Sequence, residues 1–174
     1  ISNQIRSIYQ DSRGRLYFTS LNGLSVYDGA RFTNYTVENG LSNNIVNCVM
    51  EMGDDSVWIA TNTGILNCLV AGRLKTVLFK DPSIPVINNL CRDGKGTLYA
   101  ATDQGLYLID HDRFSKLPFT DIKGKDVNTY IAYIFSIGNY LLVQRDYSLL
   151  RNEGFPLYLY NKETKKITAQ MEMI

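Results

Sequence analysis

The single histidine, His111, lies between Asp110 and Asp112, where metal or acid–base chemistry would be sought first. An imidazole beside carboxylates can hold a metal ion or act as a general base. A calcium site, however, needs six or more converging oxygens, and a catalytic zinc site needs three protein ligands. Two carboxylates that flank one histidine on a tight turn point apart. We therefore predict an exposed turn at His111 and no metal site.

The three cysteines, Cys48, Cys68 and Cys91, are odd in number, and their spacing matches no zinc site. Cys48 aligns with Ile8 and Leu90 of sister repeats, so we predict a small core residue there. One turn histidine cannot supply a Ser-His-Asp set, and neither G-x-x-x-x-G-K nor G-x-G-x-x-G is present. We therefore expect this chain to contribute no catalytic residue, to hold no cofactor and not to be an enzyme.

Recurring charged residues also favour structural roles. Aspartates recur at the first hairpin turn of each clear repeat, where their carboxylates are expected to accept backbone N–H groups. These aspartates are Asp11, Asp54, Asp55 and Asp93. The lysines Lys162, Lys165 and Lys166 are interrupted by Glu163 on a predicted hairpin, so we predict a solvated turn rather than a nucleic-acid patch.

Overall charge and hydropathy exclude two classes of partner. Eighteen basic and 17 acidic residues give a net charge of +1, so no global attraction to nucleic acid is expected. No run of 18 apolar residues is present, so we expect no membrane contact by this segment.

The chain repeats itself with a period of about 41 residues, and this repeat must position all the residues above. Gly23, Gly64 and Gly105 lie 41 positions apart, and Thr19, Thr61 and Thr102 precede them at near-constant spacing. The run Ser2–Ile5 returns forty positions later as Ser42–Ile45. Periods of 40 to 45 built from short apolar runs and glycine turns are typical of β-propeller blades.

Each repeat predicts four short antiparallel strands, and no helix of useful length is expected. The inner strands are predicted at Ile5–Gln10, Ile45–Glu51, Ile87–Arg92 and Ile131–Ser136, within blades 2–41, 42–84, 85–126 and 127–174. Asn22-Gly23 and Asp28-Gly29 are strong hairpin signals, because both turn positions need φ > 0. We expect the glycines Gly23, Gly64 and Gly105 to adopt such conformations, and Trp58 to pack between blades.

Four blades are the low end of the propeller range, and a single blade cannot bury both of its faces. We therefore predict an all-β, partial β-propeller that is a fragment of a larger, seven-bladed one. The first and last blades should expose apolar faces, and their expected partners are the remaining blades or another copy of the chain.

The repeat pattern resembles the two-component regulator propeller repeat, through the strand pair Val57–Ile65 and the connector Asn39–Ile45. The first three repeats match well and the fourth only in its apolar frame. The resemblance implies a periplasmic sensor domain of a Bacteroides-type hybrid two-component histidine kinase, anchored in the inner membrane and signalling to transcription. Many members of the family sense oligosaccharides. None of the histidine-kinase motifs is present here, so phosphotransfer would belong to the parent protein.

In a propeller, the loops from second to third strand and from blade to blade emerge on one face. The candidate ligand-binding residues on that face are Asn22, Asn43, Asn62, Asp103, Gln104, Tyr130, Arg145 and Tyr147. Amides, carboxylates and aromatic rings suit sugar hydroxyls, although ordinary turns use the same residue types. The fourth repeat departs from the pattern between Arg145 and Pro156, so Tyr147 stacked on a sugar beside Arg145 and Asp103 is the leading site.

Two alternatives stay open at this point. The chain could be a protein-interaction propeller without a small ligand, or part of a lyase or hydrolase propeller whose catalytic residues lie in other blades. Two glycine-flanked histidines in later blades would favour the lyase, and calorimetry against a glycan panel would separate a sensor from a scaffold.

Overall fold

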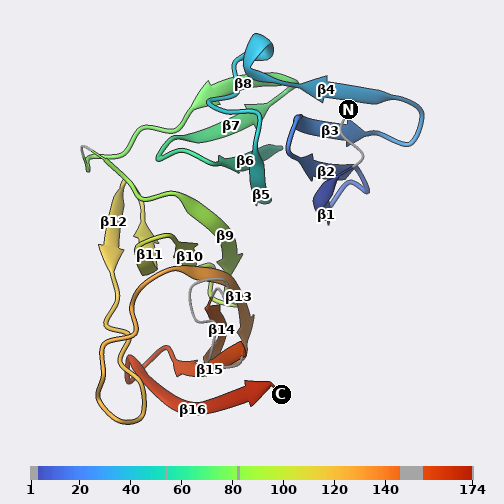
Figure 1. Ribbon diagram of the computed structural model, residues 1–174. Coiled ribbons are helices and arrows are strands. Elements are labelled where there is room, and N and C mark those ends of the chain that lie inside the picture. The colour runs from blue at the N-terminus through green and yellow to red at the C-terminus, as the bar shows by residue number, and fades with distance from the viewer. Residues whose placement is uncertain (1–3, 54, 82, 146–154, 174) are drawn as a thin grey trace. The chain divides into compact units, whose positions relative to one another are not determined.

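Short β-strands account for nearly all regular structure in a computed structural model that describes residues 4–53, 55–81, 83–145 and 155–173. The strands form four four-stranded antiparallel sheets, each a simple meander, as Figure 1 shows. One short 3₁₀ helix, Val37–Asn39, is the helical element of the described residues. The prediction of four four-stranded antiparallel blades is confirmed.

The strand bounds follow the glycine turns closely. The first two sheets comprise β1 (Ile5–Gln10), β2 (Leu16–Ser20), β3 (Gly23–Tyr27), β4 (Phe32–Tyr35), β5 (Val46–Gly53), β6 (Ser56–Thr61), β7 (Leu66–Val70) and β8 (Arg73–Thr76). The last two comprise β9 (Ile87–Arg92), β10 (Leu98–Thr102), β11 (Gly105–Asp110), β12 (Arg113–Lys116), β13 (Ile131–Ile137), β14 (Tyr140–Arg145), β15 (Phe155–Asn161) and β16 (Lys166–Met173).

The chain divides into two compact units, Ile1–Ile87 and Asn88–Ile174. In the first unit, the facing sheets β1–β4 and β5–β8 bury a core that includes Tyr17, Leu24, Val57 and Ile59. In the second, Phe119 of the β12–β13 connector packs edge-on against Tyr158, with ring centroids 5.4 Å apart, inside the core of the unit. Each unit is thus a pair of blades with its own apolar centre.

The strand pairing of the first two blades corrects one prediction. Val49 lies opposite Ile59 as Ile8 lies opposite Phe18, and the same β-bulge occurs in both inner strands, between Ile5 and Ser7 and between Val46 and Cys48. The prediction that Cys48 takes the place of Ile8 is therefore wrong by one position, because the paired strands keep a spacing of 41 residues and matching Ile45 to Ile5 uses 40. Cys48 is nevertheless a free, buried cysteine, as expected of a small core residue.

The residue that closes the turn between second and third strands is a hydroxyl in the first and third blades. Ser20 Oγ and Thr102 Oγ1 donate to the carbonyl groups of Gly23 and Gly105, at 3.0 and 2.8 Å. Each hydroxyl also accepts the N–H two residues ahead. Ser20, rather than the predicted Thr19, is therefore the first-blade counterpart of Thr102.

The three spaced glycines are required chiefly by close backbone approach. Gly23 and Gly105 have φ of +119° and +121°, as predicted, but Gly64 does not have a positive φ, so that prediction is wrong there. A Cβ at Gly64 would instead clash with the carbonyl oxygen of Ile84. Added Cβ atoms at Gly23 and Gly105 would clash with Tyr35 and Asn128. The end of β4 in the first blade, and the connector after the fourth strand in the second and third blades, thus pass directly over the glycine.

Apolar side chains remain exposed on the first and last sheets. On β13, Tyr133, Phe135 and Ile137 alternate and are each more than half exposed, and Ile8 on β1 is 62% exposed. Alternation places the β13 residues on one sheet face, which is apolar and solvent-accessible.

Trp58 is half-buried and packs edge-on against Phe79 of its own repeat, with ring centroids 6.1 Å apart.

Candidate functional site

The three predicted ligand residues of the first unit surround one blade-to-blade connector. The N–H of Gly23, next to Asn22, donates to the Asn44 carbonyl at 2.7 Å, and the Asn62 N–H donates to the Ile45 carbonyl at 2.9 Å. Asn43 lies in the same connector, and its Oδ1 accepts the Ile45 N–H at 2.8 Å. Asn22 and Asn62 are exposed, so their amides face solvent beside the connector.

The second unit repeats this arrangement at its own connector. Asp103 and Gln104 form the turn between β10 and β11. Just after this turn, the Leu106 N–H donates to Oδ1 of Asn128 in the connector, at 2.8 Å. Arg145 Nη2, at the end of β14, donates to Thr129 Oγ1 at 2.7 Å.

Two further features of this connector bear on binding. Arg145 Nε is buried and has no hydrogen-bond partner among the described residues. The Tyr130 hydroxyl lies 3.4 Å from Asn88 Oδ1. Tyr147 lies outside the described residues. The predicted set is therefore divided between the two units, with one group at each connector.

A second polar site, not predicted from the sequence, lies at the opposite end of the second unit. It begins with the tight turn between β9 and β10. Asp93 Oδ1 accepts the N–H groups of Lys95 and Thr97, both at 2.9 Å, and the Asp93 carbonyl accepts the Gly96 N–H. The aspartate thus holds its own turn, as expected for Asp93 and, equally, for Asp11.

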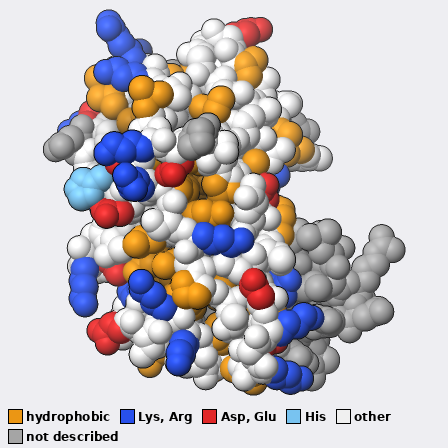
Figure 2. Space-filling view, turned by 90° about the vertical axis from the view of Figure 1, so that its left-hand side faces the viewer, with side chains coloured by type: hydrophobic (Ala, Val, Ile, Leu, Met, Phe, Trp, Pro, Cys, Tyr) orange, Lys and Arg blue, Asp and Glu red, His pale blue; other side chains and the backbone are white. Residues whose placement is uncertain are grey.

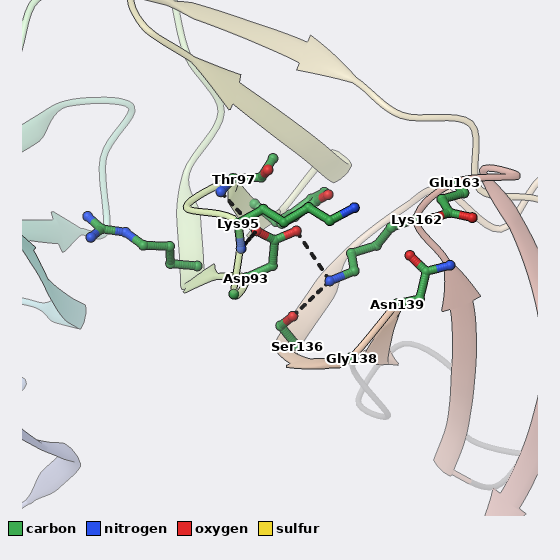
Figure 3. A pocket seen from close by; sticks show the side chains of 11 residues that line it. Asp93, Lys95, Thr97, Ser136, Gly138, Asn139, Lys162 and Glu163 are labelled. Atoms are coloured by element: carbon green, nitrogen blue, oxygen red, sulfur yellow. Dashed lines mark hydrogen bonds and ion pairs between the residues drawn. The ribbon is translucent and has the colours of Figure 1, made fainter.

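The second carboxylate oxygen of Asp93 reaches across to the neighbouring blade. Lys162 Nζ, on the turn between β15 and β16, lies 3.2 Å from Asp93 Oδ2 and 3.1 Å from Ser136 Oγ (Figure 3). The Lys162 side chain is only 8% exposed and that of Asp93 5%. The prediction of a solvated turn is therefore wrong for Lys162, although Lys165 and Lys166 are exposed.

The turn geometry explains the inward direction of Lys162. Asn161 Oδ1 accepts the N–H groups of Glu163 and Thr164, and the Lys162 N–H donates to the Asn139 carbonyl at 3.0 Å. The β15–β16 turn is thereby fixed against the β13–β14 turn. The lysine side chain can then extend across the joint between the two blades.

A pocket of about 710 Å³ lies over this ion pair. Its polar lining includes Lys95, Thr97, Ser136, Asn139 and Lys162. The aromatic ring of Tyr99 and two glycines without side chains, Gly94 and Gly138, also line the pocket. Hydroxyl, amide and ammonium groups that converge around an aromatic ring can bind a polar ligand by hydrogen bonds and stacking.

Burial and charge set the ionisation of the pocket residues. Burial opposes ionisation of Asp93, but hydrogen bonds from Thr97, Lys95 and Lys162 outweigh it and lower the pKa of the carboxyl group. Burial, with the nearby Asp93 charge, raises the pKa of Tyr99 to about 12. Burial also raises the pKa of the Cys91 thiol to about 12. At neutral pH the pocket therefore holds the Asp93 carboxylate beside the neutral phenol of Tyr99, and the Cys91 thiol, which does not line the pocket, is neutral.

The histidine and the cysteines supply no metal centre in the part of the chain described by the structure. His111 lies in the β11–β12 turn with φ +51°, and its side chain is 92% exposed, so the predicted exposed turn is confirmed. Figure 2 shows the imidazole at the surface, in pale blue, with charges of both signs around it. Among the described residues no helix is long and apolar enough to cross a bilayer.

One sequence signal could have pointed to Lys162. Arg15, four residues after Asp11, ion-pairs with that aspartate at 2.6 Å, whereas Thr97 follows Asp93 at the same spacing. An Asx-turn aspartate without a local cation is left with one unsatisfied carboxylate oxygen. The missing partner had to come from another blade.

Comparison with known proteins bears on the repeat and the fold. Residues 1–22 match the family described as "Two component regulator propeller". No curated protein sequence matches the chain. The extracellular domain of a candidate hybrid two-component system of B. thetaiotaomicron, BT3049, superimposes with a TM-score of 0.73 at 18% identity. That match covers 100% of this chain and 25% of the other.

Two further structures show the same fold. The extracellular domain of another candidate hybrid two-component system of B. thetaiotaomicron, BT4673, matches with a TM-score of 0.55 at 19% identity, over 82% of this chain and 26% of that one. Virginiamycin B lyase from Staphylococcus aureus matches with a TM-score of 0.66 at 16% identity, over 99% of this chain and 58% of the lyase.

At these identities the matches show the fold alone. The chain spans about a quarter of the length of the two sensor domains. The predicted resemblance to the regulator propeller repeat is confirmed over residues 1–22. The chain is a propeller segment that resembles extracellular domains of hybrid two-component systems, and its residues 1–22 match the two-component regulator propeller family.

Proposed function

We propose that the chain is a ligand-sensing module in the extracytoplasmic part of a hybrid two-component sensor histidine kinase. The observation that carries this proposal is the family match of residues 1–22, together with the fold likeness to the BT3049 extracellular domain. In this view the module lies in the periplasm, and binding shifts the population of sensor arrangements that control the kinase across the membrane. Kinase and receiver modules belong to other parts of the protein.

The ligand class is proposed to be oligosaccharides, recognised at the two connectors. Exposed amides at Asn22 and Asn62 can each donate to and accept from a sugar hydroxyl. Arg145 Nη2 is held by Thr129 Oγ1 at 2.7 Å, and a guanidinium has further N–H donors that can bond to a ligand oxygen. Loops on a rigid β scaffold are the usual carriers of such binding residues.

Thermal shift assays against a panel of neutral and acidic oligosaccharides test this proposal. A specific ligand should raise the melting temperature in a saturable manner. Arg145→Ala and the pair Asn22→Ala/Asn62→Ala should each reduce that shift while changing the unliganded melting temperature little. Asn34→Ala, on β4, is a matched amide control. A full ligand shift in all the connector variants would overturn the connector site.

We also propose that the apolar face of β13 is covered by a following blade of the same protein. Tyr133, Phe135 and Ile137 present one apolar face, 55%, 64% and 51% exposed, and blade-on-blade packing buries such faces. A concentration series in analytical ultracentrifugation tests the idea. The isolated chain should self-associate or bind a hydrophobic dye, and a chain extended by its following blades should do neither. A monomer that binds no dye would contradict the proposal.

A further inference from the structure

The buried ammonium group of Lys162 has more donors than the protein uses. An ammonium carries three hydrogens, and two of them are directed to Asp93 Oδ2 and Ser136 Oγ. Among the described residues the third hydrogen has no acceptor. Because the side chain is 8% exposed and lines the pocket, this donor faces the pocket at a place where bulk water is restricted.

The rest of the pocket adds positive charge and further donors. Lys95 and Lys162 bring ammonium groups to the lining, and Asp93 and Glu163 bring carboxylates. The Asp93 carboxylate already accepts two backbone N–H groups and the Lys162 ammonium, so little of its acceptor capacity remains for a ligand. Lys95 is exposed at the rim and forms no ion pair among the described residues. The unmet requirement of this pocket is therefore for an acceptor that carries negative charge.

We propose that this pocket binds an oxyanion, a carboxylate or sulfate group, carried by a small polar molecule. Lys162 provides a buried, positioned donor and Lys95 an exposed one, and charge-assisted hydrogen bonds to oxyanions are about twice as strong as neutral ones. The Asn139 amide and the Tyr99 ring flank the same space and can hold the polar body of the ligand. If the sensor function proposed above holds, on which this choice of source rests, the molecule is an acidic sugar.

The location of the pocket gives binding a mechanical consequence. Lys95 belongs to the β9–β10 turn and Lys162 to the β15–β16 turn, so an oxyanion held by both would connect adjacent blades of the second unit. The bridge adds to the existing Asp93–Lys162 pair. Ligand binding should therefore strengthen the joint between these blades and raise its resistance to unfolding.

Calorimetric titration of the chain with sodium sulfate, sodium D-glucuronate and neutral D-glucose, at constant ionic strength set by chloride, tests the proposal. Saturable binding is expected for at least one of the two anions and none for glucose. Lys95→Met should weaken anion binding by about tenfold or more, since one charge-assisted hydrogen bond is worth about 1.5–3 kcal/mol. Lys116→Met, an exposed lysine of β12 outside the pocket, should bind as the parent does.

Lys162→Met should abolish anion binding, but it also removes the partner of Asp93, so Lys95→Met keeps the test decisive if the former does not fold. Unchanged affinity in Lys95→Met, or binding of glucose as tight as that of both anions, would overturn the proposal.

Tighter binding of glucuronate than of sulfate supports an acidic sugar, and the reverse supports a free anion. Either ranking supports the oxyanion site. A neutral oligosaccharide that binds only at the connectors, without anion binding, would overturn this site and leave the sensor proposal intact. Anion binding without any oligosaccharide binding would do the opposite.

Discussion

The two units use the same turn to build two different blade joints. In both, an aspartate at the first hairpin turn accepts two N–H groups from its own loop through Oδ1. In the first unit, Asp11 Oδ2 is paired within its own blade, by Arg15 at 2.6 Å and the Tyr17 hydroxyl at 3.1 Å. In the second, Asp93 Oδ2 takes its cation from the neighbouring blade, through Lys162.

The difference follows from one position, four residues after the aspartate. Arg15 fills this position in the first unit and its guanidinium also ion-pairs with Asp55 of the next blade, while Ser12 bonds to Glu51. The Thr97 side chain is too short to pair with Asp93 or to reach the next blade. The space beside Asp93 is therefore open to Lys162 and to a ligand. A structural turn can therefore become part of a joint between blades when its local counterion is replaced by a distant one.

The largest effect on stability is expected at the equivalent glycines of the two units, Gly64 and Gly105. Gly105→Val should cost about 3 kcal/mol or more of unfolding free energy, because it adds a positive-φ strain to a clash with Asn128. Gly64→Val should cost less, about 1–3 kcal/mol, since only the clash with Ile84 applies.

Denaturant unfolding followed by circular dichroism measures both variants, and fluorescence of the single tryptophan, Trp58, reports on the first unit. Equal costs at the two positions would show that φ strain contributes nothing. Neutral effects would contradict the close approach of the connectors.

Removing each cation should affect the two joints unequally. Lys162→Met is expected to lower the unfolding free energy by about 1–3 kcal/mol, because the Asp93 Oδ2 is left buried without a donor. Arg15→Met should cost less through the aspartate, since the Tyr17 hydroxyl still donates to Asp11 Oδ2. Paired denaturation curves with Lys116→Met as control measure the difference. A double-mutant cycle with Asp11→Asn measures the part of the Arg15→Met loss of unfolding free energy that depends on the aspartate. If that part exceeds the loss in Lys162→Met, the expected ranking is wrong.

Transplanting the first joint into the second sharpens the comparison. Thr97→Arg should place a guanidinium near Asp93 as Arg15 lies near Asp11, and so recover about 1 kcal/mol when it is added to Lys162→Met. The measurement is the midpoint of urea unfolding of the double variant against Lys162→Met alone. If Thr97→Arg lowers the stability of Lys162→Met further, the fourth position does not decide which cation serves the aspartate.

A smaller effect concerns acid. Burial by itself would raise the pKa of the Asp11 and Asp93 carboxyl groups, but the hydrogen bonds around them outweigh burial and lower both pKa values below the ordinary value. The resulting stability is complete above the unfolded pKa of about 3.9 and is lost as the pH falls below it through the folded values. Asp93→Asn should therefore flatten the decline in melting temperature between about pH 4 and pH 2, relative to the parent. An unaltered acid profile would show that Asp93 is not a linked group.

The sequence predicted the parts of the fold that local turn chemistry decides. Glycine and Asx signals near Asp11 and Asp93 located the first hairpins, and alternating apolar runs located the strands. The inner strand of the second repeat was placed one residue out of register, since matching Ile45 to Ile5 uses a spacing of 40 where the paired strands keep 41. A further turn of the same kind, Asp121–Lys125, was missed because it lies in a connector outside the strand repeat, although Asp121 Oδ1 accepts the Lys123 and Lys125 N–H groups just as Asp93 does.

The two sites differ in predictability for a similar reason. Topology alone assigns the connector residues to one end of the blades, and the structure places Asn22, Asn43 and Asn62 around one connector. The Asp93–Lys162 pair joins residues 69 positions apart, and its lysine looks like a solvated turn residue in one dimension. Its burial depends on how two blades pack, which no local pattern encodes.

Ligand-dependent autophosphorylation of the full-length protein in membrane vesicles tests the sensor function most directly. The ligand would be the oligosaccharide that stabilises this chain in the thermal panel. We predict that this ligand changes the rate of phosphate incorporation, and that Arg145→Ala shifts the response to higher ligand concentration. A full-length protein without kinase activity, or one whose phosphorylation ignores every ligand that binds this chain, would contradict it.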